Sequence, residues 1–305
     1  MKVHPKKSLG QHFLTDENIA RKIIGALNPA IPVVLEVGPG KGILSKYLLE
    51  SSAFDPWFVE IDRESVAYLR MTYPQITPRL IEADFLKFDL SEFITKDEGR
   101  WTKDEGRGIK SETRQPTINN RQPTIDHQQS TTDNRQSTAY TLQLLGNFPY
   151  NISSQILIQV LEHRELVAEV TGMFQREVAQ RIAAPPGSKT YGILSVLLQA
   201  FYRIEYLFTV SEPVFFPPPN VKSAVVRLVR NEVESLGCDE AFWMTVVRTA
   251  FNQRRKTLRN SLRKLAPPGF TGFSDPLFDL RPERLSVEDF VRLTTMLHPE
   301  EPGKK

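Results

Sequence analysis

The sequence predicts an α/β fold, with a Rossmann-like sheet of about seven strands in residues 1–232 and a smaller all-helical domain in residues 233–305. Short apolar runs alternate with helical patterns between residues 32 and 230, as expected for a largely parallel sheet. A glycine-rich turn at residues 38–42 joins the first run to a helical pattern, and sheets of this class bind ligands at such a junction.

The expected elements follow in order along the chain. We expect strands at residues 32–37, 57–59, 79–83, 142–146, 167–175, 203–208 and 223–230. We expect helices at residues 43–49, 153–161, 176–182 and 193–201. The first strand is apolar almost throughout, which is typical of a parallel strand buried on both faces. In such a sheet the carboxyl ends of the strands face one ligand crevice.

Composition narrows the class of protein. The single cysteine, Cys238, excludes an intramolecular disulfide bond and fits a reducing compartment. No apolar run approaches the roughly 20 residues that span a bilayer. The basic N-terminus has no apolar stretch behind it, so it does not resemble a signal peptide. We therefore expect a cytoplasmic protein without a membrane partner, and we expect a monomer.

The tetrapeptide Asn147-Phe148-Pro149-Tyr150 lies between an expected strand and an expected helix, at the crevice. Taken alone it is also typical of a turn. An amine on a flat nitrogen base is a poor nucleophile, because its lone pair is spread into the ring. The Asn147 carboxamide oxygen and the backbone carbonyl of residue 148 or 149 can each accept one N–H and hold the amine pyramidal. With Tyr150 stacked on the base, the motif predicts methyl transfer to such an amine.

Three successive strand ends indicate the methyl donor. Gly38 and Gly40 let the backbone approach a ligand closely, and Glu60 follows the second strand, where an acid can bind both hydroxyls of a ribose. Asp84 follows the third strand and is placed to bind the amino group of an adenine. The Gly-x-Gly-x-Gly spacing departs from the dinucleotide motif. Adenosine without a pyrophosphate, beside an amine-binding motif, predicts S-adenosylmethionine as cofactor; we expect no metal.

Seven motifs carry a resemblance to a known family. They are KSLGQHFL (7–14), LEVGPGKG (35–42), GNFPYNIS (146–153), FQREVAQR (174–181), FFPPP (215–219), VKSAVVRL (221–228) and FNQRRKTLRN (251–260). In that order they resemble the bacterial small-subunit (16S) rRNA adenine N6,N6-dimethyltransferases, the KsgA or RsmA family. The resemblance implies an enzyme that dimethylates two adjacent adenosines near the 3′ end of 16S rRNA in small-subunit particles, with a role in small-subunit biogenesis.

The resemblance also implies roles that chemistry alone does not reveal. It places His12 and Leu14 over the cofactor, together with Asn147. It places Phe215 on the face of the target base opposite Tyr150, so that a flipped adenine would lie between two aromatic rings. Whether Phe215 or its neighbour Phe216 faces the base stays open. The expected catalytic residues are Asn147, Pro149, Tyr150 and Phe215.

Seven basic residues and no acid lie between Arg248 and Lys264. Arg255, Arg259 and Arg263 follow at intervals of four and would share one face of a helix, opposite an apolar stripe. We interpret this face as phosphate-binding, and the resemblance implies that the C-terminal helical domain contacts rRNA. The expected RNA-binding residues are Arg248, Arg254, Arg255, Lys256, Arg259 and Arg263.

Residues 96–140 depart from the family pattern. TKDEGR at 95–100 returns at 102–107, and RQPTI at 114–118 returns at 121–125. Large apolar residues are almost absent, so the segment cannot bury enough surface to fold. We expect a duplicated, disordered insertion that the fold tolerates.

Three other functions stay open. A sister family that dimethylates one large-subunit rRNA adenine and confers macrolide resistance shares the fold and the tetrapeptide, although the basic segment and the proline-rich loop favour the small-subunit interpretation. The chain could also be an assembly factor whose ribosome binding matters more than its chemistry. A transcription-factor relative of the fold is disfavoured because the whole cofactor site is present.

Overall fold

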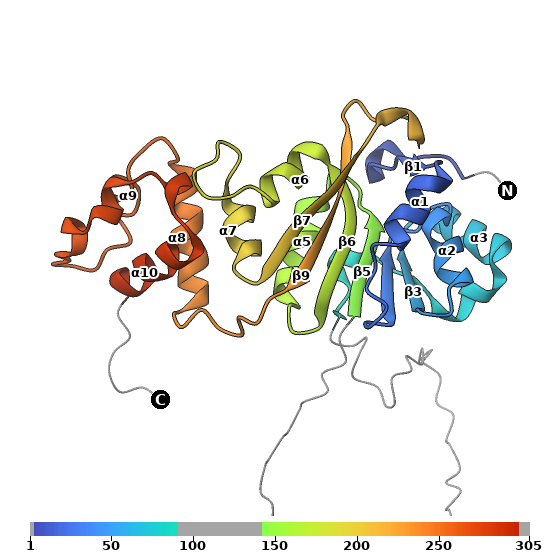
Figure 1. Cartoon of the computed structure of the whole chain (residues 1–305), viewed down its shortest axis with the longest axis horizontal. Coiled ribbons are helices and arrows are strands. Elements are labelled where there is room, and N and C mark those ends of the chain that lie inside the picture. Colours follow the sequence, from blue (N-terminus) through green and yellow to red (C-terminus); the bar gives the residue numbers. More distant parts are fainter. Residues whose placement is uncertain (1–2, 91–141, 299–305) are drawn as a thin grey trace, which may run out of the picture. The chain divides into compact units, whose positions relative to one another are not determined.

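The computed structural model describes residues 3–90 and 142–298 (Figure 1). Within them seven strands form one sheet in the order β4-β3-β2-β5-β6-β9-β7. The strands are β2 (Val33–Val37), β3 (Asp55–Glu60), β4 (Leu80–Glu82), β5 (Leu142–Asn147), β6 (Val167–Gln175), β7 (Tyr202–Val210) and β9 (Ser223–Arg230). The first five in the sheet are parallel, and β9 is antiparallel to both β6 and β7. The predicted Rossmann-like sheet is confirmed.

The strand order reverses beside β2. β3 and then β4 lie on one side of β2, and the next strand in the sequence, β5, lies on the other side of β2. The parallel register pairs Leu35 with Leu144 and Glu36 with Leu145. A crevice opens outside the carboxyl ends of the strands at such a reversal. The glycine turn after β2 and Asn147 at the end of β5 therefore lie at the same crevice.

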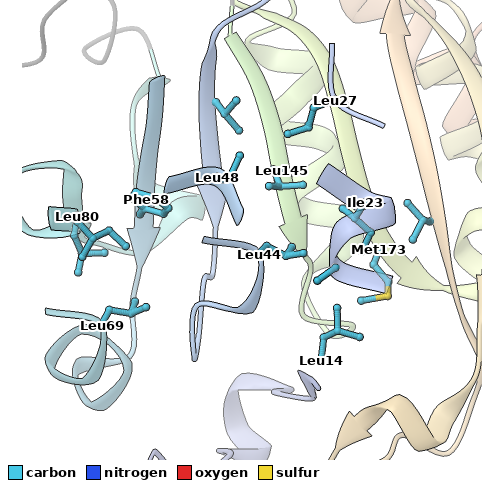
Figure 2. Close-up of a cluster of buried hydrophobic side chains, with 14 of the residues drawn as sticks. Leu14, Ile23, Leu27, Leu44, Leu48, Phe58, Leu69, Leu80, Leu145 and Met173 are labelled. Carbon is cyan, nitrogen blue, oxygen red and sulfur yellow. The ribbon is translucent and has the colours of Figure 1, made fainter. Parts of the chain in front are cut away.

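Helices precede and connect the strands; those that begin at residues 43, 153, 176 and 193 were predicted from the sequence, whereas those at 17–24 and 63–72 were not. They are α1 (Glu17–Ile24), α2 (Ile43–Glu50), α3 (Arg63–Thr72), α5 (Ser153–Glu162), α6 (Arg176–Ile182) and α7 (Ile193–Gln199). Leu44 of α2, Phe58 of β3 and Leu145 of β5 belong to one buried cluster (Figure 2). Burial of each such side chain contributes roughly 1.5–3 kcal/mol, so this cluster fixes the strand ends that carry the site.

Helices also follow the last strand, as the sequence predicts. They are α8 (Glu240–Asn252), α9 (Leu258–Ser261) and α10 (Val287–Leu297), and α8 contacts both α7 and α10. The predicted helical face through Arg255, Arg259 and Arg263 is wrong, because α8 ends at Asn252. The N–H of Leu258, which is fully buried, donates to the Leu280 carbonyl (2.9 Å) instead of continuing α8. Tertiary packing thus overrides the local pattern.

Two very short strands bring the N-terminal segment to the proline-rich loop. β1 (Phe13–Leu14) pairs antiparallel with β8 (Phe215–Phe216), with Leu14 opposite Phe215. Two-residue strands leave no periodicity in a sequence, so this pair was not predicted. The boundary expected at residue 232 stays a prediction, and the insertion expected at 96–140 lies outside the described residues. Among residues 3–90 and 142–298, no helix has the length and apolarity needed to cross a bilayer.

Candidate active site

A pocket of about 270 Å³ opens at the carboxyl ends of the parallel strands. Nearly all of the predicted cofactor and catalytic residues line it, namely His12, Leu14, Gly38, Gly40, Glu60, Asp84, Asn147, Pro149 and Tyr150. They come from the N-terminal segment, from the ends of β2 to β5 and from the loops that follow. The structure therefore brings together residues that the sequence singled out for separate reasons.

The glycine turn and Glu60 form one hydrogen-bonded unit. Gly38 and Gly40 have left-handed φ angles of 69° and 57°, which glycine adopts without strain. Glu60 Oε2 accepts the N–H of Gly40 and Oε1 accepts the N–H of Asp62, both at 2.9 Å. Burial raises the pKa of the Glu60 carboxyl, while these two backbone donors oppose the rise. Each oxygen keeps a lone pair for a ligand hydroxyl.

The same pocket has a fitting acceptor for an adenine. Asp84 follows β4, and its Oδ1 accepts the N–H of Leu86 (3.1 Å), which fixes the side chain. Its Oδ2 lies 3.9 Å from the Lys87 ammonium and stays able to accept a further donor. A Cβ at Gly38 would meet no atom within 4 Å, so the backbone there is open to a ligand. A diol acceptor, an amino-group acceptor and an open backbone together fit S-adenosylmethionine.

Glu36 lines the pocket and is a site residue that the sequence prediction missed. It lies in β2 with 1% of its surface exposed, and Ser45 Oγ donates to its Oε2 at 2.8 Å. Burial raises the pKa of Glu36 to about 8; the bond from Ser45 opposes the rise, and nearby Glu60 adds to it. An acid inside an otherwise apolar strand was the signal available in the sequence.

The buried Glu36 carboxyl should make folding stability fall as pH rises. It ionises near 4.5 when unconstrained and near 8 in the fold, so between these values the folded state holds the extra proton. The free energy of unfolding then falls by up to about 1.4 kcal/mol per pH unit. Glu36→Gln keeps the shape and should be more stable than wild type near pH 8, with little difference near pH 5. Denaturant unfolding at both pH values measures this, and equal pH slopes in the two proteins would contradict it.

The buried ring of Phe148 holds the tetrapeptide in place against the sheet. Its ring is 1% exposed and packs against Phe174, with ring centroids 5.0 Å apart. The ring fills space left by two glycines, Gly146 of β5 and Gly172 of β6. A Cβ on Gly172 would lie 2.1 Å from Phe148 Cε2. The position of Asn147 and Tyr150 therefore depends on a glycine of the neighbouring strand.

Gly172→Ala is expected to displace Phe148 and with it the tetrapeptide. Overpacking of this kind costs about 1–3 kcal/mol of stability, and a shift of about 1 Å at reacting groups lowers turnover about 10²-fold. Thermal unfolding and steady-state methyl transfer measure the two effects. Gly192→Ala is the matched control, because its added Cβ would meet no atom closer than 3.9 Å. Equal turnover in the two variants would show that Phe148 does not position the motif.

Tyr150 and Asn147 are each held by a contact from another element. The Tyr150 hydroxyl hydrogen-bonds to Ser223 Oγ of β9, and Ser223 is fully buried. Burial raises the pKa of Tyr150, so its hydroxyl stays neutral at physiological pH. Asn147 Nδ2 donates to the main-chain carbonyl of His12 (2.8 Å). Ser223 is a second residue that sequence reasoning did not assign to the site.

Phe215 does not take the position that the sequence predicts. It is 3% exposed, lies in the hydrophobic core and does not line the pocket. Alternation along β8 turns its neighbour outward instead. Phe216 is 56% exposed, and the Lys41 ammonium lies 5.6 Å from its ring centroid. Phe216 is therefore the better placed of the two to meet an incoming base.

A family model described as ribosomal RNA adenine dimethylase matches residues 3–297. The chain belongs to this family. It is accordingly an S-adenosylmethionine-dependent adenine dimethyltransferase whose substrate is ribosomal RNA. The "Ribosomal RNA small subunit methyltransferase A" of Parabacteroides distasonis is 47% identical over 96% of the chain and 93% of the relative. The protein of the same name from Porphyromonas gingivalis is 47% identical over 97% of the chain and 99% of the relative.

Two solved structures share the fold. A dimethyladenosine transferase from Plasmodium falciparum has a TM-score of 0.65 at 23% identity, covering 92% of the chain and 96% of that structure. The 23S rRNA methyltransferase ErmE has a TM-score of 0.56 at 22% identity, covering 93% of the chain and 99% of that structure. At these identities the likeness supports the Rossmann-like fold alone and leaves the choice of ribosomal subunit to other evidence.

Two of the predicted RNA-binding residues pair with acids of the described chain, and the other four do not. Arg259 pairs with Asp279 at 2.5 Å, and Arg254 donates to the Lys189 carbonyl at 2.6 Å and lies 3.8 Å from Glu283. The acids come from later in the chain, so the segment does have counter-charges in the fold. Exposed side chains without an ion pair to any described acid remain at Arg248, Arg255, Lys256 and Arg263.

Proposed function

We propose that this chain dimethylates the N6 amino groups of two adjacent adenosines near the 3′ end of 16S rRNA, within small-subunit particles. We further propose that it acts as a cytoplasmic monomer and serves small-subunit biogenesis. One observation carries the proposal: relatives named for the small subunit match almost the whole chain.

The cofactor would be held by the residues around the glycine turn. When bound, S-adenosylmethionine supplies an electrophilic methyl group. Glu60 would accept from the ribose hydroxyls and Asp84 from the adenine amino group, while Gly38 and Gly40 give the methionine end close access to backbone. Leu14 is 4% exposed and would close the apolar side of the pocket.

The tetrapeptide would orient the target amine. Asn147 Oδ1 accepts one N–H of the adenine amino group, and a backbone carbonyl accepts the other. The Phe148 and Pro149 carbonyls are the two candidates for this role, and the Pro149 carbonyl also accepts the Ile152 N–H (3.2 Å). The two acceptors hold the nitrogen pyramidal with its lone pair toward the methyl group. After transfer the cationic nitrogen releases its proton to solvent, so no charged base is needed.

The exposed basic residues would contact rRNA phosphates. Arg255→Ala with Arg263→Ala should weaken binding to small-subunit particles and reduce the salt dependence of log K, because each lost phosphate contact lowers the slope by about 1. Arg259→Ala is the matched comparison, since that guanidinium is paired with Asp279. Binding measured at several salt concentrations tests this. An unchanged slope in the double variant would show that Arg255 and Arg263 do not contact rRNA phosphates.

Methyl transfer to purified ribosomal particles tests the proposed function. Unmethylated small-subunit particles and large-subunit particles are incubated separately with labelled S-adenosylmethionine, and the products are mapped by nucleoside mass spectrometry. Dimethyladenosine confined to small-subunit RNA supports the proposal. Label in large-subunit RNA would support the macrolide-resistance alternative, and particle binding without any label would support an assembly factor.

A further inference from the structure

The N-terminal segment before β1 is held firmly across the pocket. The Lys6 ammonium pairs with Asp62 Oδ1 at 2.5 Å, and Asp62 is buried two residues after the ribose-binding Glu60. Gln11 Oε1 accepts the Lys6 N–H at 2.9 Å, and Gln11 Nε2 donates to Asp62 at 3.4 Å. Together with the β1–β8 pairing, these bonds fix His12 between two anchored points.

His12 contacts three elements that surround the target amine. Its Nδ1–H donates to the Pro217 carbonyl of the proline-rich loop at 2.8 Å, and a carbonyl acceptor requires the proton to be on Nδ1. Its imidazole is stacked on the Tyr150 ring, with centroids 5.4 Å apart and an interplanar angle of 27°. Its main-chain carbonyl accepts the Nδ2–H of Asn147 at 2.8 Å.

The bond to Asn147 decides which way its carboxamide faces. A carbonyl oxygen can only accept, so the amide nitrogen must point to His12 and Oδ1 must point away from it. Oδ1 is the atom that has to accept the N–H of the adenine amine. The main chain of residue 12 thus selects the one amide orientation that is productive.

The ring contact restricts Tyr150 in a similar way. Tyr150 is bonded at its hydroxyl to Ser223, and His12 covers one of its two ring faces. A base that stacks on Tyr150 is thereby directed to the other face. The Pro217 bond ties the same imidazole to the loop that carries the exposed Phe216.

We propose that His12 is a positioning residue for the target adenine: its side chain backs the Tyr150 ring and ties the proline-rich loop to it, beside the main-chain carbonyl that sets the Asn147 carboxamide. This inference rests on the proposed methyl transfer to adenine, and it differs from the cofactor contact expected for His12. A cofactor contact would act on the affinity for S-adenosylmethionine, whereas a positioning residue acts on turnover.

Three substitutions separate the contacts of the side chain. His12→Ala removes both the hydrogen bond to Pro217 and the ring contact with Tyr150. His12→Phe keeps a ring against Tyr150, and His12→Asn keeps a donor for Pro217. His4→Ala is the matched control, a histidine of the same segment that is exposed. For each protein we would measure the S-adenosylmethionine dissociation constant by calorimetry. Turnover, KM and the ratio of mono- to dimethyladenosine would be measured on unmethylated small-subunit particles.

His12→Ala is expected to bind the cofactor within about threefold of wild type and to turn over about 10²-fold more slowly at saturating cofactor, with more monomethyladenosine. The Phe and Asn variants should each recover part of that loss. Weaker cofactor binding with normal turnover at saturating cofactor would overturn the inference in favour of a cofactor contact. Equal or faster turnover would also overturn it, because the side-chain contacts of His12 would then not position the adenine. A wild-type protein that forms no dimethyladenosine would instead overturn the proposed function itself.

Discussion

Asn147→Ala is expected to lower the turnover of adenine methylation at saturating cofactor by about 10²- to 10³-fold, a larger effect than the loss of S-adenosylmethionine affinity that follows from its expected cofactor contact. The carboxamide supplies one of two acceptors for the amine, and its orientation is fixed by the bond to the His12 carbonyl. Without it one N–H is unpaired and the nitrogen can return to the flat, unreactive form. Single-turnover methyl transfer and cofactor calorimetry measure the two quantities.

Asn18→Ala is the matched control for this experiment. Asn18 is an exposed asparagine of α1 whose carboxamide bonds only to Arg21 of the same helix among the contacts described. Its removal should change turnover by less than about twofold. An Asn147→Ala protein that retains turnover close to wild type would show that the amine is oriented by other groups.

Glu60→Gln is expected to weaken S-adenosylmethionine binding by roughly 10- to 100-fold, the loss expected for a charge-assisted hydrogen bond. The carboxylate accepts one backbone N–H on each oxygen, so the amide nitrogen would have to face either the Gly40 or the Asp62 donor. The variant would also lose one acceptor for the ribose. Calorimetric titration with the cofactor measures the change.

Glu50→Gln at the end of α2 is the comparison, because that side chain is exposed. It should bind the cofactor as wild type does. Wild-type affinity in Glu60→Gln would mean that the ribose is held elsewhere. A large loss of stability without a change in affinity would confine Glu60 to shaping the glycine turn.

Much of the fold was predictable because its strands are buried. Continuous apolar runs such as the one before the glycine turn leave few alternatives to a parallel strand. Parallel strands also gather their carboxyl ends at one edge, so Glu60, Asp84 and Asn147 could be assigned to one pocket before any geometry was known. The structure places all three around it.

The remaining features depend on contacts between distant segments. The β1–β8 pair and the bond from His12 to Pro217 join residues about 200 positions apart, and two-residue strands carry no periodic signal. The break after Asn252 follows from the burial of Leu258, although the local pattern favoured one continuous helix. Phe215 was assigned by resemblance, whereas the alternation of β8 turns it into the core and exposes Phe216.

Mapping N6,N6-dimethyladenosine in cells tests the central claim most directly. The chain would be expressed in bacteria that lack their own small-subunit adenine dimethyltransferase, with the Asn147→Ala protein in parallel. Both ribosomal RNAs would then be analysed by mass spectrometry of defined fragments. We expect two adjacent dimethyladenosines near the 3′ end of 16S rRNA with the wild-type chain and none with the variant. Dimethyladenosine in 23S rRNA, or unmodified 16S rRNA in cells that contain the folded wild-type chain, would contradict the proposed function.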